Sequence, residues 1–165
     1  MTTPQELEEK FWKELKSDMT LMLGLVNRED GHTRPMTAQR EGDRGPLWFF
    51  TVKDTDLVGE LASSARGERA FATFASEGHE LFASIHGTLR IESDRAMVEK
   101  LWNRFVAAWF EGGKDDPKLA LLRFDAEHAE LWQDASNLFS GLKLLLGIDP
   151  KQDYKDQTAQ VSLRH

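Results

Sequence analysis

The chain has 165 residues, 40% of them hydrophobic and 10% aromatic, and its 28 acidic and 21 basic side chains give a net charge of −7. A chain of this size fits one domain and can bury enough surface to fold without disulfides or metals. It contains no cysteine, which excludes disulfides, thiolate metal sites and a cysteine nucleophile, and its acidic balance argues against a nucleic-acid partner.

The first predicted element is an amphipathic helix over residues 4–17. Thr3 and Glu6 form the pattern of a capping box around Pro4, and apolar residues then recur every four positions. The segment lacks the apolar core of a signal peptide, and no later apolar run is long enough to span a bilayer. We therefore expect a cytoplasmic protein without a membrane partner.

A meander of three strands is predicted next, at residues 19–26, 33–39 and 47–51, with loops at 27–31 and 40–46. The second strand carries arginine, proline and glutamine, whereas the third is almost wholly apolar. A strand that is apolar on both sides must be covered on both faces. We therefore expect one face of the third strand in the core and the other at a dimer interface.

A second hairpin follows a short helix predicted at residues 56–65. Its strands are expected at 69–75 and 81–91, around a turn at 77–79. Gly87 interrupts the longer strand and predicts a bulge or bend there.

The strongest helical pattern follows a cap at residues 93–94 and runs as one apolar stripe to Phe110. Trp102 and Trp109 are seven residues apart on it, a spacing that indicates packing in a core or interface or, alternatively, an aromatic platform for a ligand. Gly112-Gly113 ends this helix. The Gly-Gly-Lys run is therefore not a phosphate-binding loop, which would precede a helix.

The last elements complete a hairpin-rich order in which no βαβ unit repeats. We expect residues 1–150 to form a single domain and 151–165 a polar C-terminal tail that is loose or wrapped on a partner. The fold class is mainly β with α, an antiparallel barrel with flanking helices. The remaining strands are predicted at residues 119–124 and 129–132, with a turn at 125–128 between them. A final helix is predicted at residues 138–146.

The sequence contains no familiar catalytic or metal-binding motif. None of the five histidines has the spacing that places two ligands on one helix face; His86 stands out because it lies within a predicted strand. A nucleophile elbow, a Walker loop and a glycine-rich dinucleotide motif are all missing. We predict no metal site and assign no catalytic residue.

A group of cations and hydroxyls lies near the ends of the meander strands: Arg34, Thr37, Thr51, Lys53 and Thr55. A guanidinium, an ammonium and hydroxyls can together hold a phosphate or a carbonyl-rich ring. The alternative is that these are ordinary surface side chains.

Several segments carry a resemblance to a known family. Residues 34–36, 47–51 and 53–54 resemble the flavin-binding hairpin of the pyridoxamine-5′-phosphate-oxidase-like split-barrel superfamily. Residues 82–89 and the run 108–117, Ala-Trp-Phe-Glu-Gly-Gly-Lys-Asp-Asp-Pro, resemble one branch of it, the bacterial general stress proteins that bind FMN. The match covers nearly the whole chain and implies an FMN-binding split barrel.

The resemblance also implies a homodimer with FMN at the subunit interface, and it explains the polar second strand, whose partner would be a polar cofactor. The implied contacts are Arg34, Pro35, Met36, Thr37 and Gln39 along the ring and ribityl chain, Phe50 and Thr51 on the neighbouring strand, and Lys53 and Thr55 near the phosphate.

One departure from the family bears on the phosphate. The oxidases grip it with a Ser-Arg-Lys triplet, and the matching residues here are Thr55-Asp56-Leu57. A carboxylate about 4 Å from a phosphate would cost up to ~4 kcal/mol per charge pair near the surface. Either Asp56 points to solvent and caps the helix, or Lys53, Arg34 and the helix N-terminal amides hold the phosphate. Weaker FMN binding, or acceptance of FAD, would follow.

Two further departures argue against oxidation of vitamin B6. Gln39 replaces a lysine of the oxidases, and their C-terminal Arg-x-His segment has no match before His165. The leading hypothesis is an FMN-binding general stress protein that could act as a flavin-dependent oxidoreductase. The alternatives are a non-catalytic flavin carrier or sensor, and a split-barrel binding module that has lost the flavin.

Overall fold

The computed structural model describes residues 2–28, 31–133 and 158–164. In this part of the chain the helices are α1 (Pro4–Ser17), α2 (Asp56–Leu61), α3 (Arg95–Leu101) and α4 (Arg104–Ala107), with a short 3-10 turn η1 (Gly113–Asp115). The strands are β1 (Thr20–Leu25), β2 (Arg34–Gln39), β3 (Leu47–Val52), β4 (Glu68–Ala75), β5 (Leu81–Ile91), β6 (Leu119–Gln133) and β7 (Thr158–Ser162).

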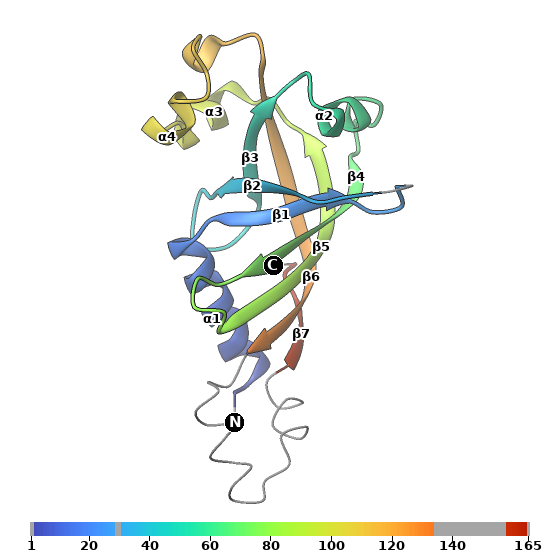
Figure 1. Ribbon diagram of the computed structural model, residues 1–165, viewed down its shortest axis with the longest axis vertical. Helices are drawn as coiled ribbons and strands as arrows, with labels where there is room; N and C mark the ends of the chain where they lie inside the picture. The colour runs from blue at the N-terminus through green and yellow to red at the C-terminus, as the bar shows by residue number, and fades with distance from the viewer. Residues whose placement is uncertain (1, 29–30, 134–157, 165) are drawn as a thin grey trace, which may run out of the picture.

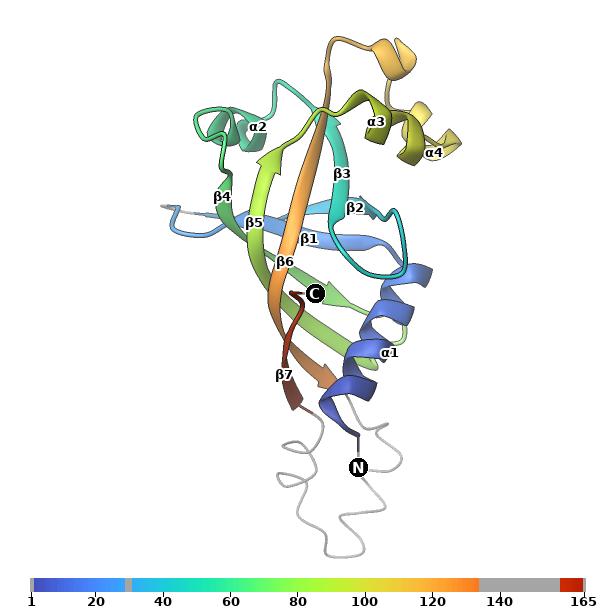
Figure 2. The same ribbon diagram turned by 180° about the vertical axis from the view of Figure 1, so that it is seen from behind.

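The strands form an antiparallel sheet in the order β3-β2-β1-β4-β5-β6-β7, which closes into a barrel because β3 also pairs with β6. One edge of β6 is shared: its first part, Leu119 to Phe124, pairs with β3, and a later part, His128 to Trp132, pairs with β7. Figures 1 and 2 show β5 and β6 running the length of the molecule, with α2, α3 and α4 at one end. The predicted split-barrel fold class is confirmed.

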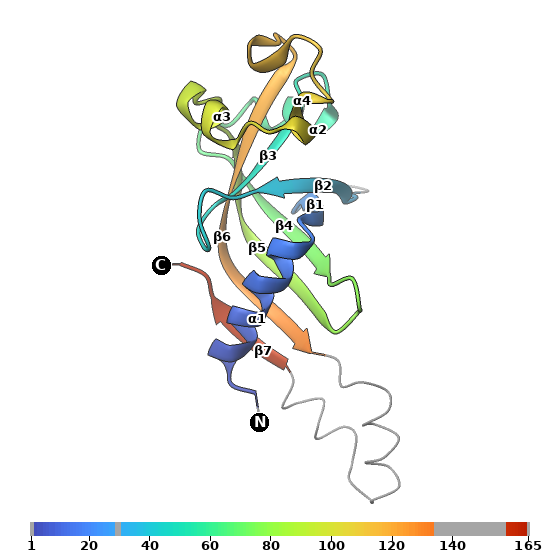
Figure 3. The ribbon, with the colours of Figure 1, turned by 90° about the vertical axis from the view of Figure 1, so that its left-hand side faces the viewer.

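Helix α1 forms as the sequence predicts. Thr3 N–H donates to Glu6 Oε2 (2.8 Å), and Glu6 N–H donates to Thr3 Oγ1 (3.2 Å), which completes the capping box. Leu7, Phe11 and Leu15 are buried in the main core. Figure 3 shows α1 lying beside β7 and the lower parts of β5 and β6. No described helix is long and apolar enough to cross a membrane.

The single long helix predicted after residues 93–94 is wrong. The chain is extended at Trp102 (φ −63°, ψ 133°), and helix α4 starts anew after Asn103, whose Oδ1 accepts from the backbone N–H groups of Phe105 and Val106 (2.9 and 3.0 Å). A side chain that caps so well ends one helix and begins another. Trp109, 81% exposed, therefore does not share a stripe with Trp102, which packs on a buried cluster.

The two separate strands predicted over residues 119–132 are also wrong, because β6 is continuous. Its polar run does not turn but pairs with β5, with Asp125 opposite Thr88 and Ala126 opposite Gly87. The bulge predicted at Gly87 is confirmed by a register shift between His86 and Gly87. A Cβ at Gly87 would lie 2.1 Å from the carbonyl oxygen of Asp125, so only glycine fits this close approach.

Much of the second face of β3, where the sequence predicts a dimer interface, is covered by residues of the same chain. Phe49 lies in the main core, whereas Trp48 lies in a second cluster with Val98 and Leu101 of α3 and Val106 of α4.

Part of the predicted loose tail is a strand. Strand β7 pairs with β6, and just after it Arg164 forms an ion pair with Glu127 (3.1 Å). Arg69, the stronger influence, and Arg164 both hold the pKa of Glu127 below its usual range. The predicted helix at 138–146 lies outside the described residues, and the domain division at residue 150 stays a prediction.

Candidate functional site

Most residues of the predicted cofactor site line one hollow between β2, β3 and the α4 region, which we call the apolar hollow. It has a volume of about 300 Å³ and no charged side chain in its lining. Its lining consists of Pro35, Met36, Thr37, Gln39, Phe50, Thr51, Val52, Phe105, Val106, Trp109 and Phe110.

The walls of the apolar hollow are fixed by contacts on both sides. Phe50 packs edge-on against Trp102 and Phe110, with ring centroids 5.9 and 6.5 Å apart. The Asn103 side chain donates to Gln39 Oε1 (3.1 Å), which ties the start of α4 to the end of β2. The side chains of Phe105 and Trp109 remain 69% and 81% exposed.

A second hollow, of about 430 Å³, collects the remaining predicted residues except Lys53, and we call it the polar hollow. Arg34 and Thr55 both line it, as do Asp56 and Glu60 of α2 and Arg28. Arg28 is engaged by Glu60 (3.2 Å) and by Glu68 (3.7 Å). Arg34 forms no ion pair within the described residues, so its guanidinium is the cation that remains available to an anionic ligand.

Thr55 and Asp56 explain how α2 begins. Thr55 Oγ1 accepts a hydrogen bond from Val58 N–H (3.3 Å), so Thr55 is the N-cap. Asp56 follows in the first turn and is exposed, where a carboxylate suits the helix dipole. The predicted alternative in which Asp56 points to solvent agrees with this placement, although the capping side chain is Thr55.

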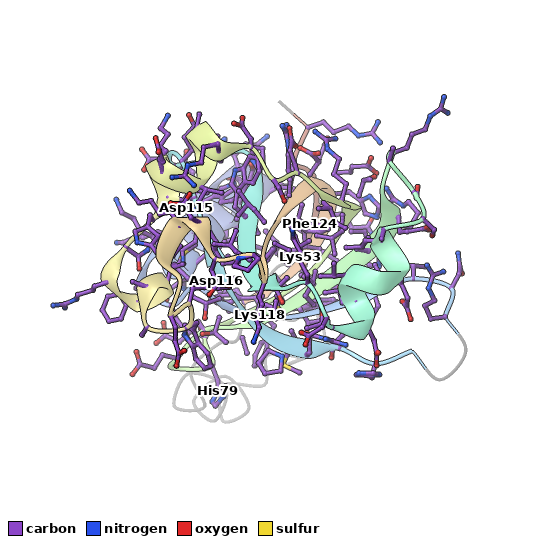
Figure 4. The ribbon with its side chains drawn as sticks, turned by 90° about the horizontal axis from the view of Figure 1, so that it is seen from above. Lys53, His79, Asp115, Asp116, Lys118 and Phe124 are labelled. Carbon is purple, nitrogen blue, oxygen red and sulfur yellow. The ribbon has the colours of Figure 1, made fainter. Side chains whose placement is uncertain are left out.

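Lys53 lines neither hollow. Its backbone N–H donates to the carbonyl of Lys118 (2.7 Å) where β3 meets β6. Figure 4 looks onto this end of the barrel and shows Lys53 and Lys118 beside each other. A phosphate role for Lys53 would require its side chain to reach across to a ligand, and it stays a prediction.

The run Gly112 to Pro117 builds a turn that supports the α4 region. The Asp116 carboxylate accepts from the backbone N–H groups of Lys118 (2.9 Å) and Gly112 (3.0 Å), and these bonds lower its pKa. Arg95 donates to Asp115 and to the carbonyl of Lys114. The turn therefore fixes the segment that follows Trp109 without contributing to the lining of the apolar hollow.

Five residues of the apolar hollow were not predicted site residues: Val52, next to the predicted Thr51, and, in the α4 region, Phe105, Val106, Trp109 and Phe110. Two signals pointed there, namely the matched run at residues 108–117 and the option that the tryptophans form a ligand platform. The prediction of one continuous helix obscured the role of Trp109 in the lining, because it placed Trp109 on a packed stripe.

The outer face of the sheet, which we call the outer sheet face, carries a further cluster of side chains. His86 stacks on His128 (ring centroids 5.2 Å apart) and on Phe71 (6.0 Å). Burial, then His128 and Arg69, lower the pKa of His86. Among the described residues no group of three or more His, Cys, Asp or Glu could hold a metal ion.

These features define a closed antiparallel barrel with an apolar hollow between β2, β3 and the α4 region. The family model described as pyridoxamine 5′-phosphate oxidase like matches residues 6–154. The chain belongs to this family.

The chain is similar in sequence or in structure to several general stress proteins. General stress protein 26 of Bacillus subtilis (strain 168) is 23% identical over 127 residues, 77% of this chain and 89% of that protein. The general stress FMN/FAD binding protein of Xanthomonas citri has a solved structure with a TM-score of 0.74 and 60% identity, over 81% of this chain and 92% of that one. A protein related to general stress protein 26, from Clostridium acetobutylicum, has a TM-score of 0.65 and 22% identity, over 79% and 90% of the two chains.

Proposed function

We propose that this protein is a general stress protein that binds a flavin nucleotide, FMN or FAD, with the isoalloxazine ring in the apolar hollow. The observation that carries the proposal is the pair of neighbouring hollows, one apolar and one containing Arg34. A flavin nucleotide has a flat ring at one end and an anionic tail at the other, so it needs this combination. The name of the Xanthomonas citri relative supports it.

The roles of the residues follow from the hollow that each one lines. Pro35, Met36, Thr37 and Gln39 of β2, with Phe50 and Thr51 of β3, would contact the ring and ribityl chain. Arg34 and Thr55 would face the phosphate from the polar hollow. A bound flavin would supply the redox chemistry, while the chain positions the ring and excludes water from one side of it.

We further propose that two copies associate through the outer sheet face. The strand register aligns three rows of outward residues across the sheet. Apart from the histidines, Glu130 is the one acidic or basic side chain in these rows. Such depletion of charge is typical of interface cores. Met22 and Phe82 are exposed on this face, 38% and 37%. The rows, drawn from the described strands, are Phe71, His86, His128, Ser162; Met22, Thr73, Ser84, Glu130, Gln160; and Ala75, Phe82, Trp132, Thr158.

The test is an absorbance spectrum of the purified protein before and after incubation with FMN and desalting. Retained flavin bands, at about one flavin per chain, support the proposal. A protein that retains no flavin contradicts it and favours the binding-module alternative. Sedimentation velocity of the wild type and of Phe82→Asp tests the dimer, since a monomeric wild type would contradict it.

The choice between an oxidoreductase and a carrier or sensor depends on turnover. Anaerobic addition of NADPH or NADH to the flavin-loaded protein measures it directly. Bleaching of the flavin bands supports the oxidoreductase, and unchanged bands support the carrier or sensor.

A further inference from the structure

The rim of the apolar hollow carries an unusual exposure of apolar surface. Four large hydrophobic side chains are exposed among the described residues, and two of them, Phe105 and Trp109, line this hollow. The other two lie on the outer sheet face, where a second copy would cover them. The Arg104 guanidinium lies over the Phe105 ring, 4.8 Å from its centroid, yet Phe105 remains 69% exposed and Trp109 81%.

The backbone segment that carries these two side chains is held by contacts of its neighbours. Asn103 caps α4 and also bonds to Gln39, so the start of α4 is fixed to β2. Val106 and Phe110, which lie between and after the two exposed residues, are only 5% and 4% exposed and anchor the segment in the second cluster. The exposure is therefore set by the backbone, and a ligand has only the rotamers of the two aromatic side chains to order.

The size of the hollow indicates what fits between the two walls. About 300 Å³ is at the lower end of the range for small-molecule sites. This volume suits a planar ring system and not a whole nucleotide. Aromatic side chains stack favourably on such a ring whatever its substituents are.

The polar hollow offers little net electrostatic attraction to the anionic tail of a flavin nucleotide. Arg34 is its available cation, because Arg28 is already paired with Glu60 and Glu68. Asp56 lines the same hollow, and its carboxylate opposes a phosphate, whereas the charge of Glu60 is balanced by Arg28. The attraction of Arg34 for the tail is therefore largely offset.

We propose that Phe105 and Trp109 form the second wall of a clamp that holds the flavin ring against β2, and that this clamp, not the phosphate, dominates affinity. The inference rests on the proposed flavin function. Its consequence is a site that accepts riboflavin, FMN and FAD with dissociation constants within about tenfold of one another, because all three share the ring.

The experiment is a titration of flavin fluorescence with riboflavin, FMN and FAD, using wild type, Trp109→Ala, Phe105→Ala and the control Glu111→Ala. Glu111 is exposed beside the clamp but does not line the hollow. We expect Trp109→Ala to weaken all three flavins by the same factor, about tenfold, which is typical of one lost stacking contact. Phe105→Ala should act in the same direction, Glu111→Ala should have no effect, and Trp109→Phe should restore most of the affinity.

Several outcomes would overturn the clamp while leaving the flavin function intact. These are flavin binding that both alanine variants retain within twofold, a loss confined to FMN, or wild-type FMN binding more than about tenfold tighter than riboflavin binding. A loss that accompanies a fall in the sedimentation coefficient would assign the effect to dissociation of copies and would also contradict the clamp. A wild type that binds no flavin would overturn both proposals.

Discussion

The two hollows next to β2 differ in the kind of ligand group that their linings can bind. The apolar hollow has no charged lining residue and two exposed aromatic side chains at its rim. The polar hollow contains two arginines and two carboxylates, and one of the arginines is already paired. Arg34 and Pro35 are neighbours on one strand, yet they line different hollows. Shape and stacking decide binding in one place, and a nearly balanced set of charges decides it in the other.

The largest loss of flavin affinity is expected from a side chain that fills the apolar hollow. Thr37→Trp should weaken riboflavin and FMN alike by about 100-fold or more, because the indole occupies the space that a ring needs. Thr37 is exposed, so the fold should be retained. Titration measures the affinities, and circular dichroism checks the fold. Tight flavin binding by a folded Thr37→Trp variant would place the ring elsewhere.

A smaller effect is expected when the available cation of the polar hollow is removed. Arg34→Ala should weaken FMN about fivefold, because one charge-assisted contact at a partly exposed site is worth about 1 kcal/mol. Riboflavin, which has no phosphate, should bind unchanged. Lys53→Ala serves as the comparison, since Lys53 lies outside both hollows. A larger FMN loss in Lys53→Ala than in Arg34→Ala would reverse the assignment of the phosphate site.

Filling the polar hollow should matter less still. Gly59 lies on α2 and lines this hollow, and a Cβ added there would meet no neighbouring atom within 4 Å, so Gly59→Phe starts a larger side chain from open space. We expect about a threefold loss of FMN affinity and none for riboflavin, since only the tail is displaced. Equal losses for the two flavins would show that the hollows are not separate binding regions.

The smallest effect is on stability alone. Gly59→Ala should stabilise the protein by about 0.5–1 kcal/mol, because alanine is the better residue in a helix interior and meets no neighbour here. Flavin affinity should not change. Urea denaturation measures the free energy of unfolding, and a destabilised variant would show that the helical conformation of Gly59 is not the one that matters in solution.

Local patterns in the sequence predict much of the fold. The capping box at Thr3 and Glu6, the two early hairpins and the bulge at Gly87 all depend on neighbouring residues, and the structure confirms them. The predictions failed where residues that are distant in the sequence determine the local structure. The polar run before His128 has the composition of a turn, but it lies along β5 with its register set by Gly87.

By itself, the sequence determined the barrel, its family resemblance and the β2 and β3 residues that form one wall of the apolar hollow. Only the tertiary structure decided how they divide: Arg34 and Thr55 in the polar hollow, Lys53 in neither, and Phe105 with Trp109 brought to the rim of the apolar hollow. The physical reason is that an apolar stripe on a helix predicts burial, whereas the cap at Asn103 breaks that helix and turns its aromatic side chains toward β2. Spacing along a chain carries no information on such a break.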